Sequence, residues 1–301
     1  MRAASLNYRD LGVARRGTDR AVVPVSDGAG DVVSSGEGVD AWGPGDRVIT
    51  PFFRTWVDGP WHPAYGSQAF GGPIDGVLTE EVTVPAQVLA RIPDGWSYEE
   101  AATLPCAGVT AWNALSGGER RVGEGDLLVV QGTGGVSMFA LQLAAGRGAQ
   151  VAVTSSSDAK LEVAARLGSA FGVNYRTEPD WAAAVRAQAG RGADHVVEVT
   201  GQLEASMRVA RAGATISIVG TTLGGDPVPV DVSLIQQKMA TIRGIFVGPA
   251  SMLHAVAEEM ADTGSRPVID EVFAFEDAPS AYRALAAAGH VGKIVIRSLP
   301  G

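Results

Sequence analysis

The feature that most constrains this chain is a glycine-rich turn that lies directly between an apolar strand and a helix. The run LLVVQ (127–131) is typical of a buried strand, and the pattern of the residues after the turn is helical. The turn itself reads Gly132-Thr133-Gly134-Gly135-Val136-Ser137. Glycines let a backbone bend sharply and approach a pyrophosphate, whose charge is stabilised by the positive end of a helix. Ser137 takes the third glycine position of the G-x-G-x-x-G fingerprint, so an ordinary strand-to-helix turn remains the alternative.

From Asp126 onward, strands alternate with helices. The further strand-like runs are QVAVT (150–154), FGVN (171–174), HVVEV (195–199), ATISIVG (214–220) and TIRGI (241–245). Near-continuous apolar strands separated by helices are typical of a parallel sheet covered on both faces. Six such strands predict a doubly wound α/β fold that binds a dinucleotide.

The beginning of the chain has a different texture, rich in Gly, Pro and Val. Short strand-like runs such as DRVITPF (46–52) and EEVTVPA (80–86) alternate with turn signals, which predicts a small β-rich domain. The last stretch reads helix, strand, helix, strand and is too short to be a domain of its own. We therefore predict that 1–113 and 249–301 form one domain, and that 114–248 form the dinucleotide-binding domain.

Composition argues against several classes of protein. The net charge is -9 and no segment concentrates Lys or Arg, which argues against a nucleic-acid partner. The single cysteine, Cys106, excludes an intramolecular disulfide and a multi-cysteine zinc site, and it fits a cytoplasmic setting. The four histidines never fall at metal-ligand spacing. The longest uncharged run, 127–146, is better explained by a strand, a turn and a helix than by a membrane span.

The end of the second strand of the dinucleotide-binding domain indicates which cofactor is bound. Proteins that bind NAD usually carry Asp or Glu there, which accepts hydrogen bonds from the ribose. This chain has Thr154-Ser155-Ser156-Ser157, and Lys160 follows one helical turn later. Hydroxyls and a lysine suit a 2′-phosphate, so we predict NADP (NADPH) with Ser155, Ser156 and Lys160 as contacts. Capping of the helix at 158–167 by the serines is the alternative, and it is compatible with phosphate binding.

Eight segments resemble the medium-chain dehydrogenase/reductase superfamily, and among its members the zinc-independent, quinone-oxidoreductase-like ones, often labelled NAD(P)-dependent alcohol dehydrogenases. They run nearly end to end and comprise SLNYRDL (5–11), SDGAGDVVSSGEGV (26–39), GDRV (45–48), EEAATLPCAGVTAWNAL (99–115), VVQGTGGVS (129–137), NYRTEPDW (174–181), GADHVVEVTG (192–201) and GKIVI (292–296). The resemblance implies a Rossmann domain, a GroES-like catalytic domain and a homodimer. Members usually carry several strands before the segment that starts MRAASLNYRD here, so we expect a catalytic domain shortened at its N-terminus, with an open sheet edge.

The resemblance also implies that zinc ligands are missing. Zinc-dependent members hold their catalytic metal with a Cys, a His-Glu pair and a second Cys. Here Asn7 stands at the first Cys position and Ser26-Asp27 stand at the His-Glu pair, so only Cys106 matches a ligand position. One potential ligand does not hold zinc, and no metal is expected.

Roles for individual residues follow from the same resemblance. Asn7 would orient the acceptor or the nicotinamide, and Tyr8 would donate a proton or a hydrogen bond to a carbonyl, or else only pack. The positions that match cofactor contacts are Thr110, Gly132, Gly134, Gly135, Val136, Tyr175, Val199, Gly220, Val247 and Lys293. For each of them core packing or a turn is the alternative.

The expected function is hydride transfer from NADPH to a small-molecule quinone or α,β-unsaturated carbonyl, without zinc. The aromatic run around Phe52, Phe53, Trp56 and Trp61, with His62 beside it, would form an apolar acceptor pocket or pack the small domain. Two other functions stay open. One is an NAD(P)-dependent alcohol dehydrogenase, and the other is a non-catalytic NADPH-binding protein.

Overall fold

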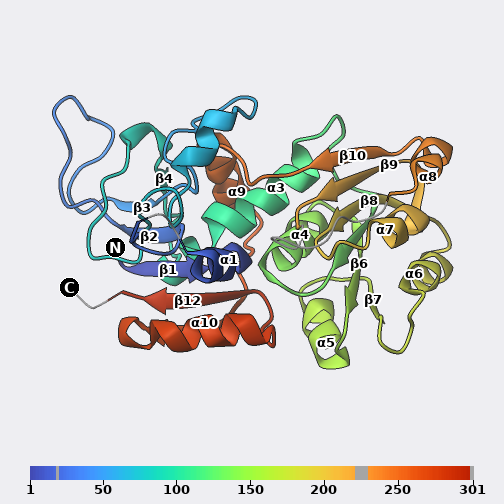
Figure 1. The fold of residues 1–301 in the computed structure, drawn as a ribbon. Coiled ribbons are helices and arrows are strands. Elements are labelled where there is room, and N and C mark those ends of the chain that lie inside the picture. The colour runs from blue at the N-terminus through green and yellow to red at the C-terminus, as the bar shows by residue number, and fades with distance from the viewer. Residues whose placement is uncertain (18–19, 221–229, 299–301) are drawn as a thin grey trace. The chain divides into compact units, whose positions relative to one another are not determined.

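The structure is a computed structural model that describes residues 1–17, 20–220 and 230–298 (Figure 1). It divides into two compact units. One unit combines Met1–Val109 with Val247–Gly301, and the other is Thr110–Phe246. A six-stranded sheet forms the centre of each unit.

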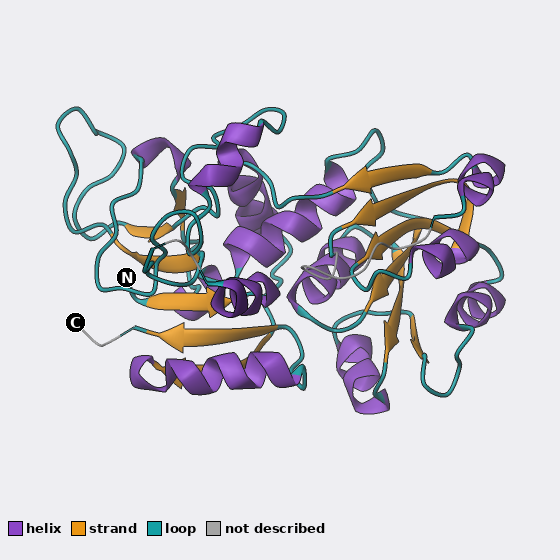
Figure 2. Cartoon of the chain, in the orientation of Figure 1, coloured by secondary structure: helices purple, strands orange, loops and turns teal. Residues whose placement is uncertain are grey.

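The unit Thr110–Phe246 is built on a parallel sheet, whose strands are drawn in orange among purple helices in Figure 2. The strand order is β10-β9-β8-β5-β6-β7. Its strands are β5 (Leu127–Gln131), β6 (Gln150–Ser155), β7 (Phe171–Asn174), β8 (Ala193–Glu198), β9 (Ala210–Ile218) and β10 (Thr241–Gly244). Between and beside them run α3 (Val109–Ser116), α4 (Gly135–Gly146), α5 (Asp158–Arg166), α6 (Trp181–Ala189), α7 (Leu203–Val209) and α8 (Val232–Lys238). The order reverses between β8 and β5, so the doubly wound α/β fold predicted from the alternating pattern is confirmed.

The sheet of the other unit is mostly antiparallel, with the order β11-β12-β1-β2-β3-β4. Its strands are β1 (Ala3–Leu6), β2 (Asp27–Asp31), β3 (Arg47–Ile49), β4 (Ala90–Arg91), β11 (Ile269–Ala274) and β12 (Lys293–Arg297). Its helices are α1 (Tyr8–Arg16), α2 (Tyr98–Ala101), α9 (Ala250–Asp262) and α10 (Ala278–Ala287), with the short segments η1 (Pro63–Gln68), η2 (Ala86–Val88), η3 (Leu104–Gly108) and η4 (Phe275–Asp277). Because β12 pairs with β1, the C-terminal segment completes the sheet that the N-terminal segment begins.

The segment 80–86, predicted as a strand, belongs to no strand, and its last residue, Ala86, begins η2. A strand needs a neighbouring backbone with which to form a hydrogen-bond ladder. The carbonyl of Glu80 accepts instead from the amino group of Met1, and that of Ala86 accepts from the Trp42 indole at 2.9 Å. A groove of about 370 Å³, lined among others by Val32 and Val82, runs beside the segment. The strand prediction for 80–86 was therefore wrong, because the period-2 apolar pattern does not by itself supply a neighbouring strand.

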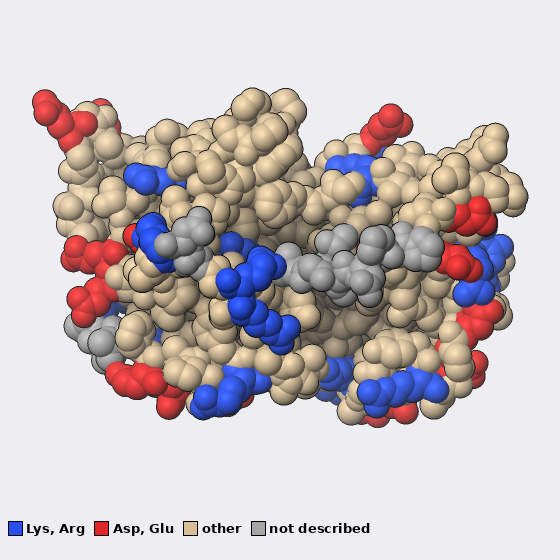
Figure 3. All heavy atoms as spheres, in the orientation of Figure 1, with Lys and Arg blue, Asp and Glu red and all other residues tan. Residues whose placement is uncertain are grey.

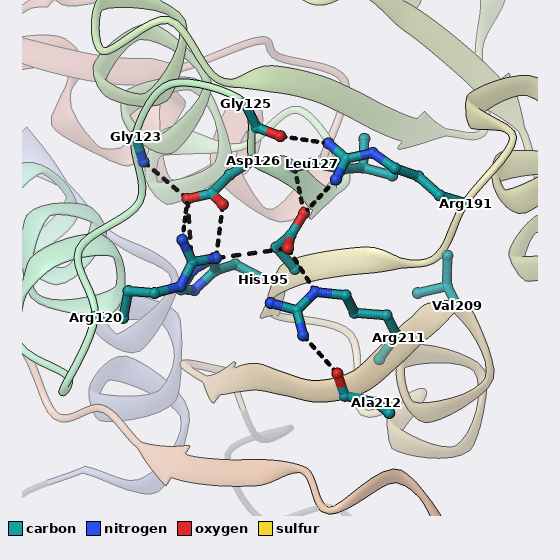
Figure 4. A network of polar contacts seen from close by, with 12 residues as sticks. Arg120, Gly123, Gly125, Asp126, Leu127, Arg191, His195, Val209, Arg211 and Ala212 are labelled. Atoms are coloured by element: carbon teal, nitrogen blue, oxygen red, sulfur yellow. Dashed lines mark hydrogen bonds and ion pairs between the residues drawn. The ribbon is translucent and has the colours of Figure 1, made fainter.

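A network of ion pairs lies at the amino ends of β5 and β8 (Figure 4). The buried carboxylate of Asp194 accepts from the backbone N–H of Leu127 at 2.8 Å, from Arg191 at 2.9 Å and from Arg211 at 2.6 Å. Burial by itself raises the pKa of Asp194, but the Leu127 amide and the Arg211 guanidinium outweigh it and hold the pKa below its ordinary value.

The same network includes a second carboxylate and a histidine. Asp126 lies 2.6 Å from Arg120, and the His195 Nε2 atom lies 3.9 Å from the Asp126 carboxylate. Burial lowers the pKa of His195, and it outweighs the opposing charge of Asp126. The ring is therefore neutral at neutral pH, and Arg120 remains the cation that balances Asp126.

One face of the molecule is drawn as atoms in Figure 3. On this face the described Lys and Arg side chains form small separate groups, and Asp and Glu side chains lie between and around them. Among the residues that the structure describes, no helix has the length and apolar character needed to cross a bilayer. The uncharged run 127–146 divides into β5, the glycine turn and α4.

Asp194→Asn is expected to lower the free energy of unfolding by about 3 kcal/mol at neutral pH, because the amide leaves two guanidinium groups without their buried counter-charge. The folded-state pKa of Asp194 lies below its unfolded value. Its stabilisation is therefore present above about pH 4 and is lost as the pH falls through the folded pKa. Urea unfolding of the variant and the wild type over this range should show the difference shrinking in acid.

The control is Glu162→Gln, which neutralises an exposed carboxylate on α5. It should change stability by less than about 0.5 kcal/mol. Equal losses in the two variants would contradict a special role for the Asp194 network.

Candidate active site

The glycine turn joins the end of β5 to the start of α4. Gly132 has a φ of +72°, which favours glycine, and its N–H donates to the Thr154 carbonyl at 2.7 Å. A Cβ atom built on Gly132 or Gly134 would meet no other atom within 4 Å, so the backbone of the turn faces open space. The first N–H groups of a helix have no acceptor within the helix. The turn and the start of α4 therefore fit the diphosphate of a dinucleotide.

Ser137, at the third glycine position, does not disturb this turn. Its side chain is buried on α4, and its hydroxyl donates to the Gln131 carbonyl at 2.7 Å. The third glycine of the fingerprint permits close packing of helix on strand. In this chain a hydrogen bond between α4 and β5 maintains that close approach.

Several of the predicted cofactor residues gather at the carboxyl edge of the parallel sheet. Val199 follows β8 and Gly220 follows β9, and a Cβ on Gly220 would lie 2.5 Å from the Val199 carbonyl oxygen. Tyr175 follows β7, and its N–H donates to the Ser155 carbonyl at 3.0 Å. Open α/β sheets bind ligands at this edge. Thr110 lies elsewhere in the unit, buried on α3.

The serines at the end of β6 differ in accessibility. Ser155 is buried, and its hydroxyl accepts from the Ser157 N–H at 3.3 Å. Ser156 and Lys160 are half-buried. Ser157 is the N-cap residue of α5, but its side chain makes no capping hydrogen bond. The capping alternative therefore does not account for the Ser157 hydroxyl.

Two residues of this edge were not singled out from the sequence. Arg176 is exposed directly after Tyr175, and its charge in the run NYR was a signal that could have been used. Glu198 is buried at the end of β8. Nothing about a single carboxylate in an apolar strand indicated what it binds.

Glu198 connects the loops that follow two strands. Its carboxylate accepts from the Gln131 amide at 3.0 Å, from the Ser206 hydroxyl at 2.5 Å, and from the N–H groups of Thr200 and Gly201 at 2.6 and 2.8 Å. Gln131 directly precedes the glycine turn. One carboxylate thus fixes the position of the turn relative to the loop after β8.

A second group of predicted residues lies in the other unit, at the end of β1. Tyr8 is the first residue of α1 and is 60% exposed, whereas Asn7 before it is buried. The Lys293 ammonium, at the start of β12, donates to the Asn7 side-chain oxygen and to the Leu6 carbonyl, each at 2.5 Å. The structure therefore brings Asn7, Tyr8 and Lys293 together.

The residues at the expected zinc-ligand positions lie in the same cluster. Asp27, fully buried at the start of β2, accepts from the Ser26 hydroxyl at 2.6 Å and from the Cys106 N–H at 2.9 Å. Burial raises the pKa of Asp27, and the Lys293 charge opposes this. Burial also lowers the pKa of Lys293, with Asp27 as the largest charge that raises it. The two groups are thus charge partners inside the unit.

A further carboxylate, Asp10, lies on the first turn of α1. One of its oxygens accepts from the Asn7 N–H at 2.7 Å, and the other, Oδ1, lies 3.6 Å from Arg9 and has no hydrogen-bond partner among the described residues. Burial raises the pKa of Asp10 to about 6.

The aromatic residues near this unit's third strand pack mainly against one another. Phe53 lies 5.5 Å from Trp56 between ring centroids, and Trp56 stacks on Tyr65 at 5.4 Å. Phe52, Phe53 and Trp56 are buried, while Trp61 is 40% exposed. Most of the expected acceptor pocket is therefore core of the unit.

Two predicted residues remain. The His62 ring adjoins the aromatic group, 6.1 Å from the Tyr65 ring between centroids. His62 is exposed, and its Nδ1 atom accepts from the Ala64 N–H at 3.2 Å. Val247 is buried before α9 with a φ of +56°, which is uncommon for a β-branched residue.

Comparison with known families accounts for both units. A family model described as alcohol dehydrogenase GroES-like domain matches residues 1–94, and one described as zinc-binding dehydrogenase matches residues 135–263. A zinc-type alcohol dehydrogenase-like protein of Schizosaccharomyces pombe is 41% identical over 99% of this chain and 89% of its own length. The chain belongs to the medium-chain dehydrogenase/reductase superfamily.

Solved structures agree with this membership. A crystal structure from Sinorhizobium meliloti 1021, of a protein proposed to be an alcohol dehydrogenase, is 40% identical with a TM-score of 0.91, covering 98% of this chain and 89% of its own. An NAD-dependent alcohol dehydrogenase is 29% identical with a TM-score of 0.85, covering 98% and 90%. The reductase CinF, in complex with NADP and 2-octenoyl-CoA, is 27% identical with a TM-score of 0.84, covering 98% and 77%.

Membership in the medium-chain superfamily settles the general chemistry. The protein is an NAD(P)H-dependent oxidoreductase of alcohol dehydrogenase-like type, and its fold implies a nicotinamide cofactor. The open backbone at Gly132 and Gly134 and the amino end of α4 fit the diphosphate of that cofactor.

Zinc, which other medium-chain members use, does not fit the side chains at the corresponding positions. Catalytic zinc is held by three protein ligands drawn from thiolate, imidazole and carboxylate. This cluster offers an amide, a hydroxyl, one carboxylate and the Cys106 thiol, whose pKa is raised by burial so that it stays protonated. The Lys293 amino group, moreover, is bonded to the Asn7 side-chain oxygen, one of these donor atoms.

Asp10→Asn is expected to flatten the pH dependence of stability. The folded pKa of Asp10, about 6, lies above its unfolded value of 3.8. The contribution of Asp10 is therefore complete below about pH 4, and up to about 3 kcal/mol is lost as the pH rises through the folded value. The amide still accepts from the Asn7 N–H and carries no charge. Urea unfolding between about pH 4 and pH 8 measures the difference, and identical slopes for variant and wild type would contradict it.

Proposed function

We propose that the protein is a zinc-independent reductase that transfers hydride from NADPH to a quinone or an α,β-unsaturated carbonyl compound. The buried Lys293 ammonium, hydrogen-bonded to Asn7 beside Asp27, carries this proposal. A buried, hydrogen-bonded lysine among residues that match metal-ligand positions supports chemistry in which side chains, rather than a metal, provide polarisation and protons.

NADPH would supply the hydride, and the chain would supply position and a proton. Tyr8, exposed at the start of α1, is the proposed proton donor or hydrogen-bond donor to the acceptor carbonyl. The N-terminal end of a helix stabilises negative charge nearby, which favours release of a proton from its hydroxyl. Asn7, which is buried directly before Tyr8, would orient this site.

Cofactor contacts are proposed for residues of the sheet edge and for two residues outside it, Thr110 on α3 and Val247 before α9. They are Thr110, Gly132, Gly134, Gly135, Val136, Ser155, Ser156, Lys160, Tyr175, Val199, Gly220 and Val247. To these we add Arg176, because its exposed guanidinium follows Tyr175, whose N–H is bonded to the Ser155 carbonyl.

NADPH is proposed over NADH on the charges at the end of β6. The run Thr154–Ser157 at the end of β6 contains no carboxylate, the nearest being Asp158 at the start of α5, and Lys160 and Arg176 follow β6 and β7 in the chain. Charge-assisted hydrogen bonds to a phosphate each contribute about 1.5–3 kcal/mol. The NADP complex of CinF supports this choice, and the NAD-dependent alcohol dehydrogenase counts against it.

The second candidate is an alcohol dehydrogenase, which the descriptions of the relatives favour. It would need a carbonyl or alcohol to be polarised without a metal or with zinc bound elsewhere. The third is a non-catalytic NADPH-binding protein. Turnover on an acceptor separates the third candidate from the first two, and dependence on zinc separates the second from the first.

A homodimer in the cytoplasm completes the proposal. β10 is an edge strand of the parallel sheet, and Met239 and Phe246 on either side of it are 74% and 55% exposed. An open edge flanked by apolar side chains is suited to pairing with a second copy about a two-fold axis. The single cysteine fits a reducing compartment.

Purified protein treated with a chelator is expected to bind NADPH and to oxidise it when an enone or a quinone is added. Fluorescence titration with NADPH and NADH measures binding, and absorbance at the nicotinamide band measures turnover. Activity that is abolished by the chelator and restored by zinc would contradict the proposal and support an alcohol dehydrogenase. Binding without turnover on enone, quinone or aldehyde would support the third candidate.

Tyr8→Phe serves as the matched variant in this assay. It removes one exposed hydroxyl and is expected to lower kcat at least about tenfold while the dissociation constant for NADPH stays unchanged. An unchanged kcat would remove Tyr8 from the mechanism without affecting the rest of the proposal.

Ser156→Asp is expected to shift cofactor preference from NADPH towards NADH by at least about tenfold in the ratio of kcat/KM values. A carboxylate repels the 2′-phosphate and accepts from the ribose hydroxyls. Ser156 is chosen because it is half-buried, whereas Ser155 is buried and a charge there would disturb the fold. Ser156→Ala, which adds no charge, should shift the ratio far less, and equal shifts would contradict the placement of the phosphate.

A further inference from the structure

Lys293 is unusual among the described Lys and Arg residues of this unit because it is almost completely enclosed. It is 3% exposed, and both of its hydrogen bonds, to Leu6 and Asn7, go to the end of β1. Burying an ammonium is costly unless it is paired and hydrogen-bonded. A side chain held in this way is fixed in place and acts on the groups that it touches.

What it touches is the junction between a strand and a helix. β1 ends at Leu6, Asn7 is the N-cap residue of α1, and Tyr8 is the first residue of the helix. The Asn7 backbone N–H is bonded to Asp10 at 2.7 Å, and its side-chain amide donates to the Ser5 carbonyl at 3.4 Å. Lys293 holds the remaining side-chain oxygen of Asn7, so both ends of this side chain are restrained.

We propose that Lys293 is a positioning residue: its ammonium locks Asn7 and the end of β1, and so fixes the direction in which Tyr8 extends from α1. This inference rests on the proposed function in giving Tyr8 the proton. It replaces the expected cofactor contact of Lys293 by an action through Asn7. The contacts support this, since both hydrogen bonds that Lys293 makes go to the chain segment that carries Tyr8.

The Asp27 carboxylate opposes the effect of burial on the pKa of Lys293. It is the largest charge acting to keep Lys293 protonated, and its own oxygens are bonded to Ser26 and Cys106. Lys293→Met alone would leave a carboxylate buried without a counter-charge and would endanger the fold. The test variant is therefore the double substitution Lys293→Met with Asp27→Asn, in which the new amide can still accept from the Cys106 N–H.

The first measurement needs no activity. The chain contains three asparagines, Asn7, Asn113 and Asn174. Labelling asparagine side chains with ¹⁵N therefore gives three pairs of amide signals, and Asn7→Ala identifies those of Asn7. In the wild type, the Asn7 amide should exchange with water at least about tenfold more slowly than that of Asn174, whose side chain bonds the exposed Asp158. In the double variant this protection should be lost, and unchanged protection would overturn the proposal.

The second measurement separates positioning from cofactor binding. The double variant is expected to lose kcat with an enone at least about tenfold, while the dissociation constant for NADPH changes less than about twofold. A tenfold rise in that constant with an unchanged kcat would restore Lys293 as a cofactor contact and overturn the proposal. If the double variant has both the melting temperature and the kcat of the wild type, Lys293 and Asp27 only neutralise each other and position nothing. That result would also overturn the proposal.

A double-mutant cycle shows whether Lys293 acts through Asn7. In the Asp27→Asn background, adding Asn7→Ala to Lys293→Met should lower kcat by less than about twofold further, because one interaction has already been lost. Losses that multiply would show independent action and contradict the proposal. Lys238→Met is the matched control, since Lys238 also holds a backbone carbonyl, that of Ala210 at 2.7 Å, but in the other unit.

Failure of the proposed function is distinguishable from failure of this inference. If wild-type protein reduces neither enone nor quinone, the proposed function fails, and the exchange rates of Asn7 still decide whether Lys293 holds that side chain. If wild-type protein is active and the Asn7 signals do not respond to loss of Lys293, the positioning role fails and the reductase stands.

Discussion

The antiparallel pairing of β12 with β1 is the contact on which the unit formed by Met1–Val109 and Val247–Gly301 depends. It places Leu6 opposite Ile294 and brings Lys293 within 2.5 Å of Asn7, a residue 286 positions earlier in the chain. Without that pairing β1 would lack one neighbour and β11 would have no link to the rest of the sheet. The polar cluster is thus a product of sheet register, because the ladder fixes where each of its members lies.

The fold of the unit Thr110–Phe246 was predicted from the sequence, and particular residues explain why. The apolar run 127–131 is buried at every position, as expected of a central parallel strand with helices on both faces. The glycine turn could be placed because a positive φ at Gly132 and an open approach require that residue type. The GroES-like unit was predicted from the resemblance to the superfamily, whose motifs run from end to end of the chain. The strand signals in that unit are too weak to specify its fold by themselves.

The candidate site was predicted in its members but not in its contacts. Asn7, Cys106 and Lys293 were each noted, yet periodicity carries no information on pairs so far apart in sequence. The burial of single residues could not be predicted either, since Ser155 and Ser156 are chemically identical neighbours, and only the end of β6 between them leaves one buried and the other half-buried. The segment 80–86 was predicted as a strand because alternating apolar residues are typical of one, although the pattern carries no information on a neighbouring strand.

The division of the chain also has a consequence for the order of folding during synthesis. One unit is a single continuous stretch, Thr110–Phe246, whereas the other needs segments from before and after it. On the ribosome the continuous unit can close around its own core while β12 has still to be made, and domains generally fold as units in the order of synthesis. During this time β1 lacks one of its two neighbours, because β12 is synthesised nearly three hundred residues later. The continuous unit can therefore acquire its dinucleotide-binding fold before the polar cluster of Asn7 and Lys293 exists, so bound cofactor can stabilise an intermediate in which the other unit is still incomplete.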